Sequence, residues 1–160
     1  MDKIAKRSEK VAFMELQSNP DKYVRMRGFT EFSQSKNPVE YSRRYIDEQT
    51  ERNDVVAYSP SISYSFDKFS DNEVHKELIQ IADLEKIGAD TVRRIVIVDL
   101  GGNEDEKSAY LRAWSVIPDS EGNDTDTYTY SGTLKANGEI LEGIAQTSDN
   151  WQSCTFTEAE

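Results

Sequence analysis

Residues 58–66 read Tyr-Ser-Pro-Ser-Ile-Ser-Tyr-Ser-Phe, and this stretch carries the clearest structural signal in the sequence. Residues with apolar side chains or rings alternate strictly with serines. Because successive side chains of a β-strand point to opposite faces, this period of two predicts a strand with one apolar face and one serine face. Pro60 has no amide proton to donate to a neighbouring strand, so this end of the strand is expected at a sheet edge or a bulge.

Further strands are predicted on both sides of this segment from alternation and from β-favouring residues. They cover residues 23–32, 40–46, 92–100, 108–117, 128–136, 139–145 and 151–157. Asn137-Gly138 is expected to form a tight hairpin turn between the strands over 128–136 and 139–145, because a type I′ turn requires two residues with positive φ.

One helix is expected after the serine-rich strand. Ser70-Asp71-Asn72-Glu73 matches a capping box, and Gly88 is a plausible helix stop. An apolar stripe follows the cap at helical spacing and consists of Val74, Leu78, Ile81 and Ala82. Eight strands and one helix predict a mainly β protein, an antiparallel β-sandwich or partial barrel with one flanking α-helix.

The chain has 160 residues, which suits one domain. We expect an N-terminal arm over residues 1–20, with a short helix over 9–17 that Pro20 ends. A single β-sandwich domain is expected over residues 21–160. Within it, the polar residues 34–54 predict a protruding hairpin or long loop, and loops of this length are often functional.

Composition excludes several classes of protein. The chain is 36% hydrophobic and 10% aromatic, which argues against intrinsic disorder. Its longest aliphatic run, residues 95–98, is far shorter than the ~20 residues of a membrane helix, and the first residues lack the apolar run of a signal peptide. The single cysteine, Cys154, excludes an internal disulfide and predicts a soluble protein of a reducing compartment.

The formal net charge is −11, from 19 basic and 30 acidic residues. Such a balance disfavours direct wrapping of nucleic acid by a basic surface. The charge is also unevenly distributed: residues 1–60 hold eleven basic and ten acidic residues, whereas residues 61–160 hold eight and twenty. This asymmetry favours head-to-tail contacts between copies, and ordinary solubility is the alternative explanation.

No residue pattern predicts catalysis, so we expect neither an enzyme nor a cofactor. The only histidine, His75, is expected to be a partly exposed helix residue, and Cys154 a small buried side chain in a strand. The acidic turn over residues 119–126 offers oxygen ligands, but Asp124 and Tyr130 stand where a calcium loop of the EF-hand type requires Gly and Glu. A solvated turn is therefore the preferred interpretation, and no metal site is predicted.

Several segments together resemble the major tail tube proteins of long-tailed bacteriophages and prophages of Gram-positive bacteria. These segments are residues 37–48, 55–67, 116–122 and 128–135, with Asn150-Trp151 and Thr155-Phe156-Thr157 near the end of the chain. The resemblance implies a structural virion protein with the sandwich described above. It implies hexameric rings that stack into a hollow tube, which conducts phage DNA into the host cell.

The resemblance also implies partners and a location. The partners would be other copies of the chain, further tail proteins (tape measure, tail terminator, and distal tail or baseplate) and double-stranded DNA that passes through the lumen without specific binding. The location would be the virion tail, assembled in the bacterial cytoplasm, without membrane insertion. Since a basic wall would hold the DNA polyanion, the acidic balance suits a lumen that repels phosphates.

Two sets of residues are candidates for these roles. The long loop and the terminal arms of such proteins reach neighbouring subunits, so the assembly interface is expected at Lys36, Asn37, Pro38, Arg43, Arg44, Asp47, Glu48, Glu51 and Arg52. The lumen-facing candidates are the hydroxyl residues Ser59, Ser61, Ser63, Thr129, Ser131 and Thr133. The alternative for this second set is a face that simply meets solvent.

Two rival functions stay open. The first is a tube subunit of a contractile injection or secretion apparatus, which would share the architecture. The second is a monomeric β-sandwich module that binds a carbohydrate or calcium. That module would need Trp114 or Trp151 exposed on a flat face, and buried core tryptophans are the expectation here.

Overall fold

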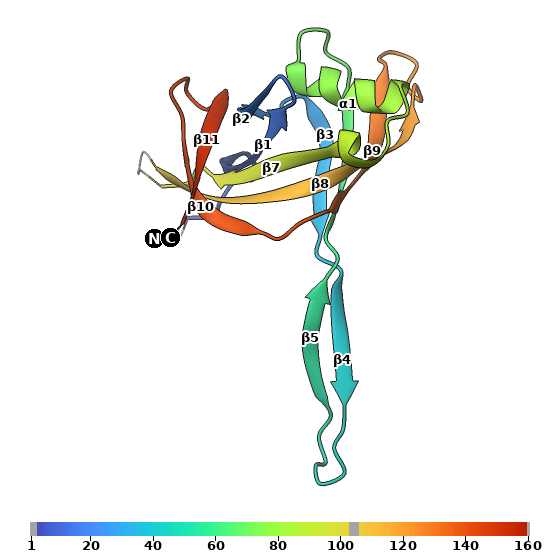
Figure 1. The fold of residues 1–160 in the computed structure, drawn as a ribbon, viewed down its shortest axis with the longest axis vertical. Helices are drawn as coiled ribbons and strands as arrows, with labels where there is room; N and C mark the ends of the chain where they lie inside the picture. Colours follow the sequence, from blue (N-terminus) through green and yellow to red (C-terminus); the bar gives the residue numbers. More distant parts are fainter. Residues whose placement is uncertain (1–2, 103–105, 160) are drawn as a thin grey trace.

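The computed structural model describes residues 3–102 and 106–159. Within them the chain is mainly β, which confirms the predicted fold class (Figure 1). The strands are β1 (Lys10–Leu16), β2 (Asn19–Arg25), β3 (Phe29–Ser35), β4 (Pro38–Arg43), β5 (Arg52–Tyr58), β6 (Ser61–Asp67), β7 (Val92–Asp99), β8 (Lys107–Glu121), β9 (Thr129–Ala136), β10 (Leu141–Gln146) and β11 (Ser153–Glu158). The helices are α1 (Glu73–Asp83) and the short 3₁₀ turns η1 (Arg7–Glu9) and η2 (Gly88–Thr91).

Six strands close into a small barrel. The antiparallel order β10-β11-β2-β1-β7-β8 returns on itself, because β10 also pairs with the first part of β8, from Lys107 to Leu111. Phe13, Val96, Val98 and Ala145 lie inside it with no measurable exposure. The barrel interior is therefore a packed core of aliphatic and aromatic side chains.

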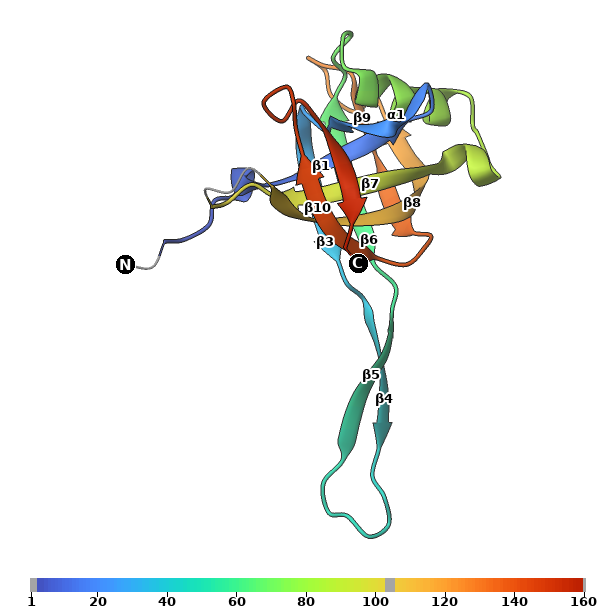
Figure 2. The same cartoon turned by 60° about the vertical axis from the view of Figure 1, so that its left-hand side comes forward.

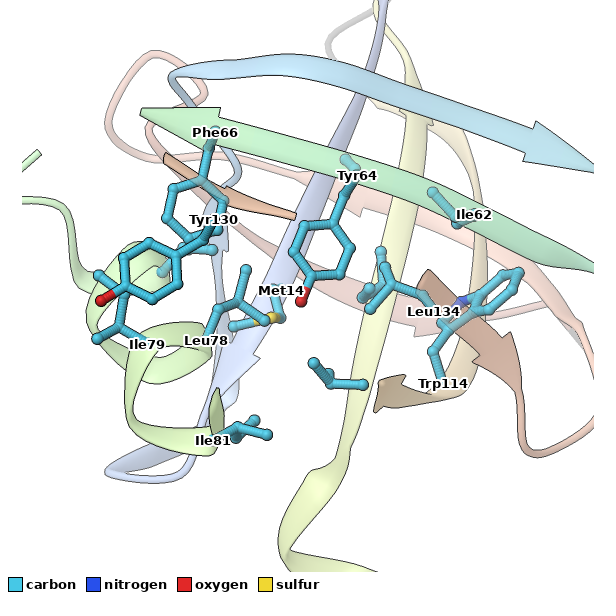
Figure 3. Close-up of a cluster of buried hydrophobic side chains, with 14 residues drawn as sticks. Met14, Ile62, Tyr64, Phe66, Leu78, Ile79, Ile81, Trp114, Tyr130 and Leu134 are labelled. Atoms are coloured by element: carbon cyan, nitrogen blue, oxygen red, sulfur yellow. The ribbon is translucent and has the colours of Figure 1, made fainter. Parts of the chain in front are cut away.

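The second part of β8 carries the same nine-stranded sheet beyond the barrel, as a four-stranded portion with the order β8-β9-β6-β3 that we call the four-stranded sheet. The strand predicted over residues 58–66 is β6, which lies in the interior of this four-stranded sheet. It begins at Ser61, three residues later than predicted. Ile62, Tyr64 and Phe66 of β6 are buried as expected, and they meet Leu134 and Tyr130 of β9 in the main core. Figure 3 shows Phe66 and Tyr130 close to α1, and Ile62 and Leu134 farther along the sheet, close to Trp114.

The helix α1 covers this core with the predicted stripe. Val74, Leu78 and Ile81 are buried, which confirms the helical spacing. The cap differs from the expectation: the Asn72 side chain accepts hydrogen bonds from the amides of residues 74 and 75, so the helix begins two residues later than the Ser70 cap predicted. Gly88 is not the stop, because the helix already ends at Asp83.

The predicted helix over residues 9–17 is wrong. The segment is strand β1, which pairs with β2 on one side and β7 on the other. Phe13 and Met14 are fully buried in the two different cores. Two apolar environments, one on each face of β1, remove the alternation that would have revealed a strand. The expected arm over 1–20 accordingly gives way to strands from Lys10 onward.

Two further expectations fail at turns. The predicted strand over 23–32 is two strands, separated at Gly28, whose φ of +78° breaks the extended chain. Asn137-Gly138 does not form a hairpin, since β10 pairs with β8 and β11 rather than with β9. Asn137 instead donates its backbone N–H to the Ala113 carbonyl at 2.9 Å, which directs the chain across β8.

None of the helices in the described part of the chain has the length and apolarity needed to cross a membrane.

Candidate assembly surface

The hairpin β4–β5 projects from the body of the molecule, at the end opposite α1 (Figures 1 and 2). It forms a two-stranded sheet of its own, and every residue of both strands is exposed. Large apolar side chains nevertheless recur along it: Val39, Tyr41, Tyr45, Ile46, Val55, Val56 and Tyr58. An isolated hairpin is only marginally stable in water, and an exposed apolar surface of this extent is a candidate contact surface.

The base of the hairpin is fixed to the four-stranded sheet by Asn37. Its φ is +46°, and its side-chain amide donates to the Ser59 carbonyl at 3.0 Å and to the Ser61 hydroxyl at 3.3 Å. The Ser59 amide returns a hydrogen bond of 3.2 Å to the Asn37 carbonyl. These bonds tie the two strands together where they leave the body, and they fix the direction in which the hairpin points.

The nine residues predicted for the interface all lie on this hairpin, its tip or its base. Arg52 forms a bidentate ion pair with Glu48, with a shortest distance of 2.6 Å, and its guanidinium stands over the Tyr45 ring. Arg43 stands in the same way over Tyr41. Lys36, Pro38, Arg44, Asp47 and Glu51 are exposed. Sequence reasoning missed the apolar members of this surface. Val55, Val56 and Tyr58 lie beyond residue 54, where the predicted segment stopped, and the four apolar residues within the segment were passed over because the residues chosen were, apart from Pro38, polar or charged.

The hydroxyl residues of neighbouring strands share one face of the four-stranded sheet. Ser63 of β6 stands between Ser33 of β3 and Thr133 of β9, and Ser65 stands next to Ser131. Ser131 in turn meets Ser120 of β8, with 2.8 Å between the two hydroxyl oxygens. We call this surface the hydroxyl face; it comprises Ser33, Ser35, Ser61, Ser63, Ser65, Thr129, Ser131 and Thr133. It lies opposite the main core.

Five of the six lumen candidates lie on the hydroxyl face, and the exception is Ser59, which belongs to the base of the hairpin. Few charges interrupt the face. Register places Glu31, Asp67 and Lys135 on the same side of the sheet, beside Ser65, Thr129 and Ser61 respectively. The face is therefore mainly polar and almost neutral, with a small acidic excess, and Ile117, which pairs with Thr133, is its exposed apolar member. Most of the net charge of −11 lies elsewhere on the molecule.

Both borders of the four-stranded sheet are open in the described part of the chain. Strand β3 pairs with β6 on one side and with no described strand on the other. At the other border, β7 leaves β8 at Ser115, so residues 116–121 of β8 pair only with β9. Unpaired borders present backbone N–H and C=O groups to any chain that approaches, and isolated proteins usually protect them.

The residues considered for chemistry are placed in the interior. His75 is fully buried, contrary to the partly exposed position expected. Cys154 is buried as predicted, and burial raises the pKa of its thiol to about 12, which makes it a poor nucleophile. Trp114 is buried in the main core, as expected, and Trp151 is half-buried against Phe13.

The acidic turn over 119–126 is stabilised by contacts within the chain. Asp124 accepts the amide of Asp126, and Glu121 accepts the hydroxyl of Tyr128 at 2.8 Å. Among residues 3–102 and 106–159, no three His, Cys, Asp or Glu side chains come together in a group suited to a metal ion.

No known protein family matches the sequence, and no curated protein is significantly similar to it. Solved structures do share the fold. A chain from the tail of an empty GTA particle with C6 symmetry superposes with a TM-score of 0.62 at 12% identity, over 86% of this chain and 97% of that chain. A chain from the virion of the native gene transfer agent gives 0.60 at 13% identity, over 96% and 99%.

A third structure with the fold is the baseplate of the anti-feeding prophage. One of its chains superposes with a TM-score of 0.51 at 9% identity, over 89% of this chain and 97% of that chain. At these identities the likeness establishes the fold. This chain therefore shares its fold with one chain each of a GTA tail, a gene transfer agent virion and the anti-feeding prophage baseplate.

Proposed function

We propose that this protein is the major tail tube subunit of a phage or prophage, and that it polymerises as stacked hexameric rings into a hollow tube. The observation that carries the proposal is the pair of open borders on one four-stranded sheet, β3 at one side and residues 116–121 of β8 at the other. The shared fold with tail chains of a particle of C6 symmetry supports it.

The strand directions suit ring closure. Neighbouring strands in the order β8-β9-β6-β3 are all antiparallel, so the first and the last of the four run in opposite directions. Copies related by rotation about a tube axis have their β8 strands running in the same direction along that axis. The β8 strand of one copy is therefore antiparallel to the β3 strand of the copy beside it. Six copies would then form one continuous antiparallel wall without a free edge.

The hydroxyl face is the side of this wall that we assign to the lumen. Hydroxyl groups keep it wet, and the excess of Glu31 and Asp67 over Lys135 makes it slightly repulsive to phosphates. Such a wall has too few basic residues to bind the phosphates of duplex DNA, so the DNA passes through without being held. The barrel and α1 then lie on the outside of the tube.

The β4–β5 hairpin is the contact between rings. Its direction away from the body takes it beyond the edge of its own ring, and its seven exposed apolar side chains would be buried against the adjacent ring. The finer assignments follow the sequence resemblance: a long-tailed phage of a Gram-positive host, assembly in the host cytoplasm, tail partners such as the tape measure, terminator and distal tail or baseplate proteins, and DNA ejection through the tube.

A tube subunit of a contractile injection apparatus is the second candidate, and the fold shared with the anti-feeding prophage baseplate favours it. Neighbouring genes for a contractile sheath would distinguish this candidate. The carbohydrate-binding module has less support, since Trp114 is buried and offers no flat stacking surface. Calorimetric titration with glycans or Ca²⁺ would detect such a module directly.

The test compares the full chain with a variant in which residues 38–58 are replaced by a short Gly-Ser linker. We expect negative-stain microscopy of the concentrated full chain to show stacked rings. The variant is expected to be a folded monomer, with an unchanged circular dichroism melting curve of the body, that forms no tubes. Normal tubes from the variant would refute the role of the hairpin. A full chain that stays monomeric at every concentration would refute the tube.

A further inference from the structure

A cavity of about 610 Å³ opens beside the free part of β8, between this strand, β9 and the end of α1. Its floor is apolar and includes Leu78, Ile81 and Tyr130. Its rim carries three carboxylates and one lysine: Glu85, Asp119, Glu121 and Lys86. Ile87, which also lines it, is 82% exposed. The cavity therefore suits a segment that combines an apolar side chain with positive charges.

The N-terminal residues 3–7, Lys-Ile-Ala-Lys-Arg, have this composition. They carry three positive charges and no negative one, and Ile4 is 90% exposed. Arg7 fixes the end of the segment to the open border of β3, since its guanidinium donates to the Phe32 carbonyl at 3.2 Å. Ala5, Lys6 and Arg7 also line a second cavity together with Phe32 and Gln34 of β3.

The strand register places residues 3–7 and the cavity at the same level along the strand direction, one at the β3 border of the sheet and the other at the β8 border. Phe32 of β3 lies in one cross-strand row with Tyr64 of β6, Gly132 of β9 and Pro118 of β8. Both features also lie on the core side of the sheet, because Phe32 shares the face of Tyr64, which lines the cavity beside β8. When β3 of one copy meets β8 of the next without a register shift, Arg7 arrives at residues 118–121.

We propose that residues 3–7 of one copy bind in the cavity beside β8 of the neighbouring copy in the same ring. Ile4 covers the exposed Ile87, and Lys6 and Arg7 approach Glu85 and Asp119. This inference rests on the proposed tube function, and it names the second contact that accompanies strand pairing. The basic segment and the acidic rim lie at opposite borders of one sheet. Charge complementarity therefore favours pairing the β3 border of one copy with the β8 border of the next.

Charge reversal and rescue test the contact in the full chain. The double variant Lys6→Glu/Arg7→Glu is expected to raise the protein concentration needed for tube formation about tenfold, since each exposed pair becomes repulsive. Adding Glu85→Lys/Asp119→Lys restores complementarity and should recover most of the loss. Assembly of the first variant at the wild-type concentration, or failure of the fourfold variant to recover, would overturn the inference.

A disulfide cross-link tests the geometry. In Ile4→Cys/Ile87→Cys, oxidation of assembled protein should give a ladder of covalent oligomers up to the hexamer on a denaturing gel. The native Cys154 does not interfere, because it is buried. Ile4→Cys/Thr155→Cys, which places the second thiol on the exposed side of β11 in the barrel, is the matched control and should give no such ladder.

The outcomes separate the two proposals. Tubes that form without the Ile4–Ile87 ladder would overturn the inference and leave the tube function standing. A wild-type chain that never assembles would overturn both.

Discussion

His75 stacks on Phe66 with ring centroids 4.1 Å apart and planes inclined by 20°. The imidazole is fully buried, and its Nδ1 accepts the backbone N–H of Phe69 at 3.3 Å. Its Nε2 makes no hydrogen bond of good geometry with any described residue. Burial lowers the pKa of His75 by penalising the imidazolium form, and this outweighs the opposing influence of the Arg27 carbonyl and the Asp67 carboxylate.

Acidification through the ordinary titration range of histidine is therefore expected to destabilise the fold. Because the folded-state pKa lies below the unfolded value of about 6.5, the stabilisation is complete above that pH and is lost as the pH falls. The free energy of unfolding should decrease between pH 7.5 and 5.5, with a slope of at most about 1.4 kcal/mol per pH unit. Urea denaturation at several pH values measures it.

His75→Phe is the control, since it keeps an aromatic ring and removes the only histidine of the chain. The variant should lose the pH dependence in this window. A wild-type stability that does not change from pH 7.5 to 5.5 would contradict the buried, neutral imidazole.

The two faces of β6 differ in what they contribute to stability. Ile62 has no measurable exposure, whereas the adjacent Ser63 is exposed on the hydroxyl face. Ile62→Ala should cost about 2–5 kcal/mol through lost burial and a cavity, and Ser63→Ala should change stability by less than about 0.5 kcal/mol. Thermal unfolding of the two monomeric variants measures the contrast. Equal effects would mean that the strand register is wrong.

Gly132 in β9 allows the close approach of β8 and Tyr64. A Cβ added there would lie 2.6 Å from the Ile117 carbonyl oxygen and 2.7 Å from the Tyr64 hydroxyl. Because the carbonyl belongs to a paired strand and cannot move away, Gly132→Ala should destabilise the protein by about 1–3 kcal/mol. Gly101→Ala is the control, as its nearest contact is the end of the exposed Asp99 side chain at 3.1 Å and not a backbone atom. Chemical denaturation that ranks the two variants equally would count against this packing.

Arg93 forms an ion pair that links β7 to α1. Its side chain is 2% exposed, its Nε donates to Glu77 at 2.9 Å, and one terminal nitrogen donates to the carbonyls of Asp90 and Val92. Glu77→Ala leaves the buried guanidinium without its counter-charge and should cost about 1–3 kcal/mol. Adding Arg93→Met should recover part of that loss. A double variant much less stable than Glu77→Ala would show that Arg93 contributes mainly through its carbonyl contacts.

Local sequence signals predicted the elements whose two sides face different environments. The alternation of β6 and the stripe of α1 are clear because one side meets the core and the other meets water. Strand β1 could not be predicted in this way, because Phe13 and Met14 face two separate cores. The partners of β10 are likewise set by distant strands, so Asn137-Gly138 suggested a hairpin that the barrel does not use.

The candidate assembly surface also has a part that local sequence predicts and a part that it does not. Polar residues and alternation indicated the hairpin tip and most of the hydroxyl face from local sequence. The open borders of β3 and β8, and the common height of Arg7 and Pro118, depend on the pairing of strands far apart in the chain. No local pattern carries that information.

The most direct measurement of the central claim is a cryo-electron microscopy reconstruction of tubes from the full chain, at a resolution that separates strands. The account predicts six subunits per ring, with β3 of each copy hydrogen-bonded antiparallel to residues 116–121 of the next and the hydroxyl face toward the axis. A reconstruction in which β3 borders solvent, or in which the barrel lines the channel, would contradict it.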